Sequence, residues 1–460
     1  TIKSVYFIGA GGIGMSALVR YFLSLGKMVA GYDRTPSALT ERLIAEGAAI
    51  HYEDSCTLIP ENCKDKSYTL VVYTPAVPQD HSELTWFRKQ GFEVQKRAQV
   101  LGTITCSRRG LCVAGTHGKT TTSSMAAHLV YGSHVGATAF LGGISQNYGT
   151  NLLLSDKSDY VVIEADEFDR SFLQLNPDVA VVTSADADHL DIYGTHEAVK
   201  EAFSQFIDRI NEGGALVIKQ GVDVEVRNSG IKCYRYSFDT PTDFYATNLE
   251  LQATGHYKFD VVTPFGVVEG CTLGIPGWVN VENAVAAVAL FILAAKAEDK
   301  EVDYDALRGA LASFSGVKRR FEFYVNTPKA VYMDDYAHHP RELSAAITSV
   351  KKMFPCRELT AVFQPHLYTR TRDLYEEFAQ ALSLADRVVL LPIYPAREEP
   401  IEGITTEIIA QRVTAPWTIV EREQLAESLK GMDTDVVVTF GAGNIDAYCD
   451  AVAEVIKMKG

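Results

Sequence analysis

The segment LCVAGTHGKTT, residues 111–121, decides the fold of this chain. Residues 111–114 are apolar and predict a buried strand, and a helix is expected to begin at Lys119. A glycine-containing turn between a strand and a helix surrounds phosphates with backbone N–H groups, while its Lys reaches the outer phosphates and a Thr hydroxyl binds Mg²⁺. Val113 stands where the usual phosphate-loop pattern has its first glycine. The predicted phosphate-binding residues are Gly115, Thr116, His117, Gly118, Lys119, Thr120 and Thr121.

Acidic residues follow the next two predicted strands. Strand 160–163 runs into EADEFD at 164–169, and strand 179–183 runs into SADADHLDIY at 184–193. Ligands bind at the carboxyl ends of strands in open parallel sheets, so Glu164 and His189 are expected to converge on cations beside Lys119. A capping or outer role remains an alternative for His189, and the other acids of the segment fit a solvated surface.

The first hundred residues alternate predicted strands with helices, the pattern of a doubly wound parallel sheet. We expect strands at 4–8, 28–33 and 70–73 and helices at 13–25 and 36–47. The loop at 9–14 contributes Gly11, Gly12 and Gly14 to a G-x-G-x-x-G pattern, and Asp33 follows 19 residues after its last glycine. Such a loop binds any diphosphate, a dinucleotide included, and Asp33 could accept a hydrogen bond from a ribose or from a base.

Three α/β domains in series are predicted from the breaks in this pattern. The polar stretch 102–110 is interpreted as the first boundary, and FSGV at 314–317 as the second. Four short alternating segments at 231–238, 244–251, 257–263 and 267–273 predict an antiparallel insert. We therefore expect a Rossmann-like domain at 1–104, a phosphate-loop α/β domain with this insert at 105–316, and a Rossmann-like α/β domain at 317–460.

The last domain has two polar clusters, DDYAHHP at 334–340 and QPHLYTRTR at 364–372. Each follows an apolar strand, so together they predict one polar crevice at the carboxyl edge of a sheet. Arg370 could bind a substrate carboxylate with two hydrogen bonds. Arg319 and Arg320 either reach phosphates or form a solvated basic patch, and the glycine loop at 441–443 is a weak signal by itself.

Composition excludes several classes of protein. The chain has 460 residues, 43 Lys and Arg, 58 Asp and Glu and a net charge of −15, which argues against a nucleic-acid binder. The longest apolar run, 284–295, is too short to span a bilayer, and residues 1–9 contain no signal peptide, so we expect a cytoplasmic protein without a membrane partner. The eight cysteines are scattered and are expected to be reduced thiols.

Taken together, GTHGKTT, EADE, DHLDIY, DDYAHHP and QPHLYTRTR resemble the motifs of the Mur ligases, in the family's order and over essentially the whole chain. Among the branches of that family, the alanine-adding one is the most similar. The resemblance implies an ATP- and Mg²⁺-dependent ligase. In such an enzyme the lactyl carboxylate of UDP-N-acetylmuramate takes the γ-phosphoryl group of ATP, and the amine of L-alanine attacks the resulting acyl phosphate.

The resemblance also implies roles for individual residues. Lys119 would bind phosphate, and with His189, His338 and Arg370 it would form the catalytic set. Thr120 and Glu164 would bind the first Mg²⁺ and His189 the second. The implied ATP contacts beyond the phosphate loop are Asn283 at adenine, Asp335 at ribose and Arg320. The implied amino-acid pocket is Tyr336, His338, His366 and Arg370, and the implied UDP-sugar site is Gly11, Gly12, Gly14 and Asp33.

The chain departs from the family pattern at three places. Val279 replaces a frequent His near adenine, Leu367 a frequent Arg, and Phe168 the usual Ser. Later-acting members have a carbamylated Lys at the place near Phe203, so its absence here agrees with the alanine-adding branch. Three alternatives stay open: a ligase that attaches an intact tripeptide to UDP-N-acetylmuramate, an NAD-dependent dehydrogenase, and a nucleotide sensor without catalytic activity.

Overall fold

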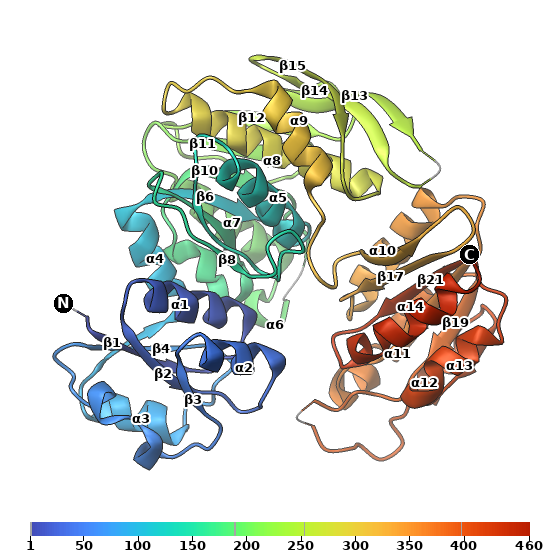
Figure 1. Ribbon diagram of the computed structural model, residues 1–460, viewed down its shortest axis with the longest axis horizontal. Coiled ribbons are helices and arrows are strands. Elements are labelled where there is room, and N and C mark those ends of the chain that lie inside the picture. The colour runs from blue at the N-terminus through green and yellow to red at the C-terminus, as the bar shows by residue number, and fades with distance from the viewer. Residues whose placement is uncertain (1, 188–189, 253, 397) are drawn as a thin grey trace. The chain divides into compact units, whose positions relative to one another are not determined.

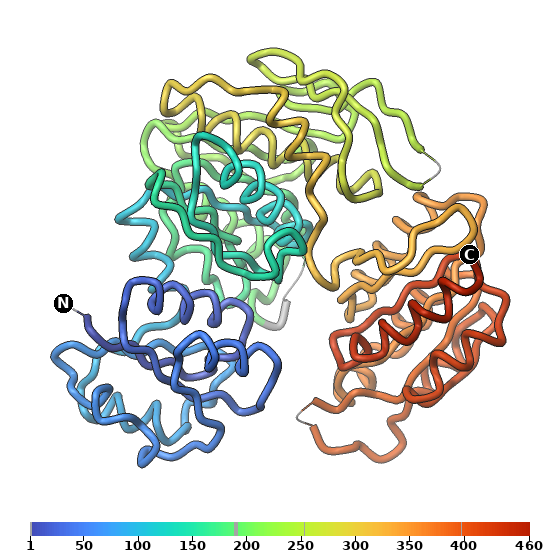
Figure 2. The backbone as a smooth tube through the Cα atoms, viewed as in Figure 1, coloured from blue at the N-terminus to red at the C-terminus, as the bar shows by residue number. Residues whose placement is uncertain are grey.

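The computed structural model describes residues 2–187, 190–252, 254–396 and 398–460. Its described strands form three sheets of five, ten and six strands, as the predicted series of three α/β domains requires (Figure 1). The N-terminus lies at the first sheet and the C-terminus at the third, and Figure 2 traces the chain between them. Two compact units are present, one of residues 1–247, 260–271 and 282–314, the other of residues 248–259, 272–281 and 315–460.

The first sheet is parallel throughout and has the order β3-β2-β1-β4-β5, which is that of one Rossmann half with its neighbouring strands. The strand order reverses at β1, so a crevice is expected at the carboxyl ends of β1 and β4. Fully buried side chains such as Phe7 and Leu18 form the core beneath α1. The elements are β1 (Ser4–Ile8), α1 (Ile13–Ser24), β2 (Met28–Tyr32), α2 (Ala38–Ala45), β3 (Ala49–His51), η1 (Cys56–Leu58), η2 (Glu61–Cys63), β4 (Thr69–Tyr73), α3 (Ser82–Lys89), β5 (Glu93–Lys96) and α4 (Arg97–Ser107).

The stretch 102–110, interpreted as the first boundary, is not a loop, because α4 extends to Ser107 and β6, the first strand of the next sheet, begins at Arg109. A Cβ atom on Gly102 would lie 2.4 Å from the carbonyl oxygen of Gln174. Gly102 therefore lets a helix approach another backbone closely, although in the sequence it resembles a loop glycine.

The second sheet has the order β15-β14-β13-β12-β11-β10-β6-β9-β7-β8. Strand β6 lies between β10 and β9 and pairs with both in parallel, so the ends of all three strands meet at one edge. The elements are β6 (Arg109–Ala114), α5 (Lys119–Tyr131), β7 (Thr138–Phe140), β8 (Leu152–Leu153), β9 (Tyr160–Ala165), η3 (Phe168–Gln174), β10 (Pro177–Val182), α6 (Leu190–Tyr193), α7 (His196–Asp208), β11 (Ala215–Lys219), β12 (Lys232–Ser237), β13 (Phe244–Leu251), β14 (Tyr257–Thr263), β15 (Gly266–Thr272), α8 (Trp278–Lys296) and α9 (Tyr304–Ser313).

The strands predicted at 231–273 are present and extend the central sheet, but the prediction that all of them pair antiparallel is wrong for β12. β12 pairs in parallel with both β11 and β13, whereas β14 and β15 are neighbours joined by two residues and so run antiparallel. Helix α8 contains the apolar run 284–295 and is long and apolar enough to cross a membrane, but 89% of its most apolar 18-residue window is buried inside the protein. It is the core helix that the sequence predicts.

The third sheet has the order β16-β17-β21-β18-β19-β20, and only β16 pairs antiparallel within it. The elements are β16 (Glu322–Asn326), β17 (Val331–Asp335), α10 (Pro340–Met353), β18 (Leu359–Phe363), α11 (Tyr368–Leu382), β19 (Arg387–Leu390), α12 (Glu407–Ala410), β20 (Trp417–Ile419), η4 (Arg422–Gln424), α13 (Leu425–Lys430), β21 (Val436–Phe440), η5 (Ile445–Tyr448) and α14 (Cys449–Lys457). All eight cysteines lie in the described residues and are free thiols, as predicted.

Candidate active site

The loop between β6 and α5 has the backbone that a phosphate-binding turn needs. Gly115 has a φ of 145°, and a Cβ atom there would lie 1.9 Å from Oγ1 of Thr183. Gly118 has a φ of 79° and is the residue before the first turn of α5. Because the first N–H groups of a helix have no partner within the helix, the start of α5 can donate hydrogen bonds to an anion.

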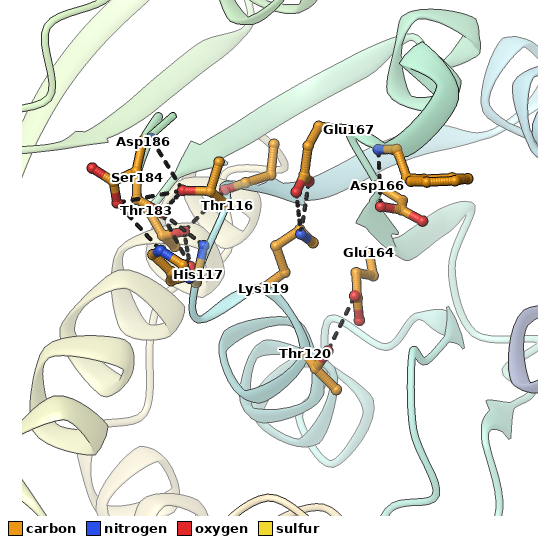
Figure 3. Close-up of polar contacts among 12 residues, drawn as sticks. Thr116, His117, Lys119, Thr120, Glu164, Asp166, Glu167, Thr183, Ser184 and Asp186 are labelled. Atoms are coloured by element: carbon orange, nitrogen blue, oxygen red, sulfur yellow. Dashed lines mark hydrogen bonds and ion pairs between the residues drawn. The ribbon is translucent and has the colours of Figure 1, made fainter. Parts of the chain in front are cut away.

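The end of β10 fixes the other side of this loop (Figure 3). The Ser184 hydroxyl accepts a hydrogen bond from the His117 N–H at 2.8 Å and another from the Thr116 hydroxyl at 2.9 Å. The Ser184 carbonyl accepts from the Thr116 N–H at 3.3 Å. The amides of Thr116 and His117 therefore hold the loop to the sheet, and the amides nearer α5 are the candidates for binding an anion.

Lys119 is held by a buried carboxylate. Its Nζ lies 2.8 Å from Oε1 and 2.7 Å from Oε2 of Glu167, and Figure 3 shows the two side chains pointing at each other. Burial lowers the pKa of Lys119, but the carboxylates of Glu167, Asp166 and Glu164 outweigh it and raise that pKa overall. Lys119 is thus charged, and Glu167, only 1% exposed, is not the solvated acid that the sequence suggested.

Thr120 and Glu164 form a pair of oxygen donors suited to Mg²⁺. The Thr120 hydroxyl donates to Oε1 of Glu164 at 3.1 Å, and a Cβ atom on Gly142 would lie 1.8 Å from Oε2 of Glu164. Magnesium usually binds one or two protein oxygens and completes its shell with phosphate and water, so the pair fits it. The described residues contain no cluster of three or more His, Cys, Asp or Glu side chains placed to hold a metal. His189, the other predicted ligand, lies outside the described residues.

Asn283, the predicted adenine contact, lies against the phosphate loop. Its Oδ1 accepts a hydrogen bond from the Thr122 hydroxyl at 3.1 Å, and a Cβ atom on Gly118 would lie 3.1 Å from the same oxygen. Residues more than 160 positions apart in the chain therefore meet at the start of α5.

The Asp33 carboxylate binds the backbone of the first glycine loop. Its Oδ2 accepts a hydrogen bond from the Gly11 N–H at 2.6 Å, and its Oδ1 accepts from the Thr35 N–H at 3.1 Å. Gly12 precedes α1, and a Cβ atom on Gly14 would overlap the Arg97 guanidinium at 1.9 Å. The structure thus places Gly11, Gly12, Gly14 and Asp33 together, with Arg97 beside them as a cation that the sequence did not single out.

In the C-terminal unit, the two acids at the end of β17 already accept hydrogen bonds. Asp334 accepts from Nε of Arg319 at 3.0 Å and from the Thr439 hydroxyl at 2.7 Å. Asp335 accepts from the N–H groups of Phe321 and Ala337, and burial raises its pKa to about 6. Arg319 also donates to the carbonyls of Gly441 and Gly443, so those two carbonyls anchor a side chain.

The predicted amino-acid pocket forms one cluster. The His338 ring lies 5.2 Å from Tyr336 and 6.3 Å from His366 between centroids, and Nη1 of Arg370 lies 3.4 Å from Nδ1 of His366. Burial lowers the pKa of His338 and that of Arg370. The Arg320 guanidinium lies 5.7 Å from the Tyr336 ring, beside the cluster.

Glu342 is a member of this cluster that the sequence did not single out. Its Oε2 accepts from the His338 N–H at 2.9 Å and the His339 N–H at 3.2 Å. Burial raises its pKa, but His338 and these two amides outweigh burial and lower it. Glu342 stands at the third position of α10 and caps the helix, so the spacing of His339 and Glu342 was the available signal.

Matches to known families cover each sheet in turn. Residues 4–109 match the catalytic domain of the Mur ligase family, residues 113–291 the Mur ligase middle domain, and residues 319–443 the Mur ligase glutamate ligase domain.

Individual proteins match along the full length. The chain is 53% identical over 462 residues to a UDP-N-acetylmuramate–L-alanine ligase of Phocaeicola vulgatus, covering 100% of this chain and 99% of that protein. A protein of the same name from Parabacteroides distasonis is 54% identical, with 99% and 97% covered.

Two solved structures share the fold of this chain over nearly its full length. The crystal structure of the UDP-N-acetylmuramate–alanine ligase of Thermotoga maritima superposes with a TM-score of 0.79 at 26% identity, covering 99% of this chain and 100% of that one. A murein peptide ligase of Psychrobacter arcticus shares the fold with a TM-score of 0.69 at 21% identity, covering 99% and 98% of the two chains. The chain belongs to the Mur ligase family.

Proposed function

We propose that this protein is an ATP-dependent ligase that joins the lactyl carboxylate of UDP-N-acetylmuramate to the amine of L-alanine, in peptidoglycan precursor synthesis. The proposal rests on the full-length identity above 50% with relatives that bear this activity in their names. The arrangement of Lys119, Thr120 and Glu164 supports it, because phosphoryl transfer requires this positioning of charge.

Each domain has a proposed substrate. Residues 1–104 bind the UDP-sugar, supported by the glycine loop at the point where the strand order reverses. Residues 105–316 bind ATP, and residues 317–460 bind the amino acid and contribute Asp335 and Arg320 to the ATP site. These substrates are made inside the cell, so we place the enzyme in the cytoplasm.

In the first step, Lys119 and the N–H groups at the start of α5 orient the ATP phosphates. Thr120 and Glu164 would hold one Mg²⁺ there and His189 a second, and the two ions would neutralise charge on ATP and on the attacking carboxylate. Exclusion of water then protects the acyl phosphate from hydrolysis.

In the second step, Arg370 binds the alanine carboxylate and orients the amine. Because burial lowers the pKa of His338, its neutral imidazole is able to accept a proton from the alanine ammonium. The amine attacks the acyl phosphate, and phosphate leaves.

The substitution Lys119→Ala tests the assignment of ATP to this loop. We expect a loss of at least about a hundredfold in the rate of phosphate release, because charge stabilisation at the transferred phosphoryl group is lost. UDP-sugar binding should survive, and exposed Lys157→Ala is the matched control. Phosphate release at the wild-type rate in Lys119→Ala would remove ATP from the loop.

A comparison of two substrates tests the alternative that the protein attaches an intact tripeptide to UDP-N-acetylmuramate. We expect L-alanine to be used far more efficiently than the tripeptide L-Ala-γ-D-Glu-diaminopimelate. A higher kcat/KM with the tripeptide would make the protein a recycling ligase.

A further inference from the structure

The Lys119–Glu167 ion pair occupies the position that the nucleotide needs. Both carboxylate oxygens lie within 2.8 Å of Nζ, which resembles the way two phosphate oxygens would contact the same ammonium group. Before Lys119 can bind a phosphate in full, its contact with Glu167 must break or be shared.

Lys119 is the partner that can move. Its side chain is 14% exposed, whereas that of Glu167 is 1% exposed. The backbone of Glu167 is also fixed, because its carbonyl accepts from the Tyr193 hydroxyl at 2.6 Å and from the Arg170 N–H at 3.0 Å. When Lys119 turns to a phosphate, both oxygens of the buried Glu167 carboxylate lose their contact with the ammonium group, and taking a countercharge away from a buried carboxylate is costly.

The surrounding charge makes this cost depend on what arrives with the nucleotide. Glu164, Asp166 and Glu167 are the three carboxylates that act on Lys119. A nucleotide without a cation adds further negative charge to this group, while a divalent cation at Thr120 and Glu164 replaces the positive charge that Glu167 loses.

We propose that Glu167 makes nucleotide binding at this loop dependent on a divalent cation, by competing with the phosphates for Lys119 when no cation is present. This inference rests on the proposed binding of ATP to the loop. Glu167 is then a specificity-determining residue that discriminates against metal-free nucleotide.

Calorimetric titration of the full chain tests this with ADP in EDTA and ADP with Mg²⁺. The quantity compared between variants is the dissociation constant of ADP in EDTA divided by that of ADP with Mg²⁺. In Glu167→Gln, which keeps the shape but removes the charge, we expect metal-free ADP to bind about tenfold more tightly or better, so the ratio falls. An unchanged ratio would overturn the inference.

Asp166→Asn is the matched control. It removes the same charge one residue away, and Asp166 is 35% exposed and lies 3.7 Å from Arg97. We expect this ratio to change much less than in Glu167→Gln. An equal change in both variants would mean that overall charge is responsible, and would overturn the role of the ion pair.

Glu167→Asp provides a second test in case Glu167→Gln does not fold. It withdraws the carboxylate from Nζ by one methylene, so an intermediate ratio is expected and a wild-type ratio would contradict the inference. If the proposed function itself is wrong, the titration gives a different result from a failure of this inference. Mg²⁺-ADP would then fail to bind the wild type, or would bind Lys119→Ala as tightly as the wild type.

Discussion

Neighbouring acids in the segment 164–169 perform different tasks because their burial differs. Glu164 contacts Thr120, Asp166 is partly exposed beside Arg97, and Glu167 is buried against Lys119. In the sequence, the position of Glu164 at a strand end marked it as a candidate metal ligand. The sequence could not show which of the acids after it would be buried. The backbone turns sharply there, with left-handed φ values at Asp169 and Arg170, and no periodicity predicts which way a side chain then points.

Arg370 and Arg372 offer a paired test of the amino-acid pocket. Both lie on α11, but Arg370 lies in the cluster with His366, whereas Arg372 is 50% exposed and pairs with Asp373. Arg370→Ala should raise the KM for L-alanine by about tenfold to a hundredfold, the value of a charge-assisted hydrogen bond, with a smaller effect on kcat. Arg372→Ala should leave that KM within about twofold of the wild type. Steady-state kinetics with varied alanine decides, and an unchanged KM in Arg370→Ala would exclude the residue from the pocket.

Glu83 predicts a pH dependence of stability in the first domain. It is fully buried on α3, accepts from the Tyr6 hydroxyl at 2.8 Å, and burial raises its pKa to about 7. The folded state therefore binds this proton more tightly than the unfolded state, whose carboxyl has a pKa of about 4.3. The free energy of unfolding therefore decreases as the pH rises from about 4.3 to about 7, and it stays at the lower value above pH 7.

Glu83→Gln should remove that loss. We expect the free energy of unfolding of the variant to exceed that of the wild type by about 3 to 4 kcal/mol at pH 8, with the difference falling below about 1 kcal/mol near pH 4.5. Thermal unfolding at several pH values measures this. A constant difference between the two proteins from pH 4.5 to 8 would show that Glu83 does not titrate in this range.

At the scale of elements, a strand flanked by loops was predictable wherever a short apolar run ended at a glycine or an acid. β1 was predicted with its observed bounds, and α5 begins at Lys119 as expected. Helix α4 was missed, because six of its eleven residues are buried and face more than one side, which leaves no amphipathic pattern to detect. The proximity of Asn283 to α5 was not derivable from spacing either, since it depends on how α8 packs on the sheet.

The turn between β6 and α5 should tolerate no side chain at its first glycine. Gly115→Ala would place a methyl group on the Thr183 hydroxyl at a φ of 145°, so we expect a loss of stability of about 2 kcal/mol or more and loss of ATP binding. Gly309→Ala is the control, because it lies within α9 with nothing within 4 Å of the added atom. It should be neutral or stabilise by up to about 1 kcal/mol. Nucleotide titration and thermal unfolding compare the two, and normal ATP binding by Gly115→Ala would contradict the loop geometry described here.

At the scale of the whole molecule, the proposed function requires two nucleotides to bind to different sheets. The glycine loop after β1 and the lysine loop after β6 each stand at the carboxyl edge of a parallel strand, in separate sheets. The alternation of strand and helix patterns, with its breaks, was enough to predict three α/β domains. Which diphosphate each loop prefers was not predictable from the loops themselves, because any diphosphate satisfies the same backbone N–H groups.

The most direct measurement is mass spectrometry of the products formed from ATP, Mg²⁺, UDP-N-acetylmuramate and L-alanine, with ADP and phosphate quantified in the same reaction. We expect UDP-N-acetylmuramoyl-L-alanine in amounts equal to ADP, and neither product with Lys119→Ala. ATP hydrolysis without the alanyl product, or an alanyl product formed without ATP, would contradict the proposed function.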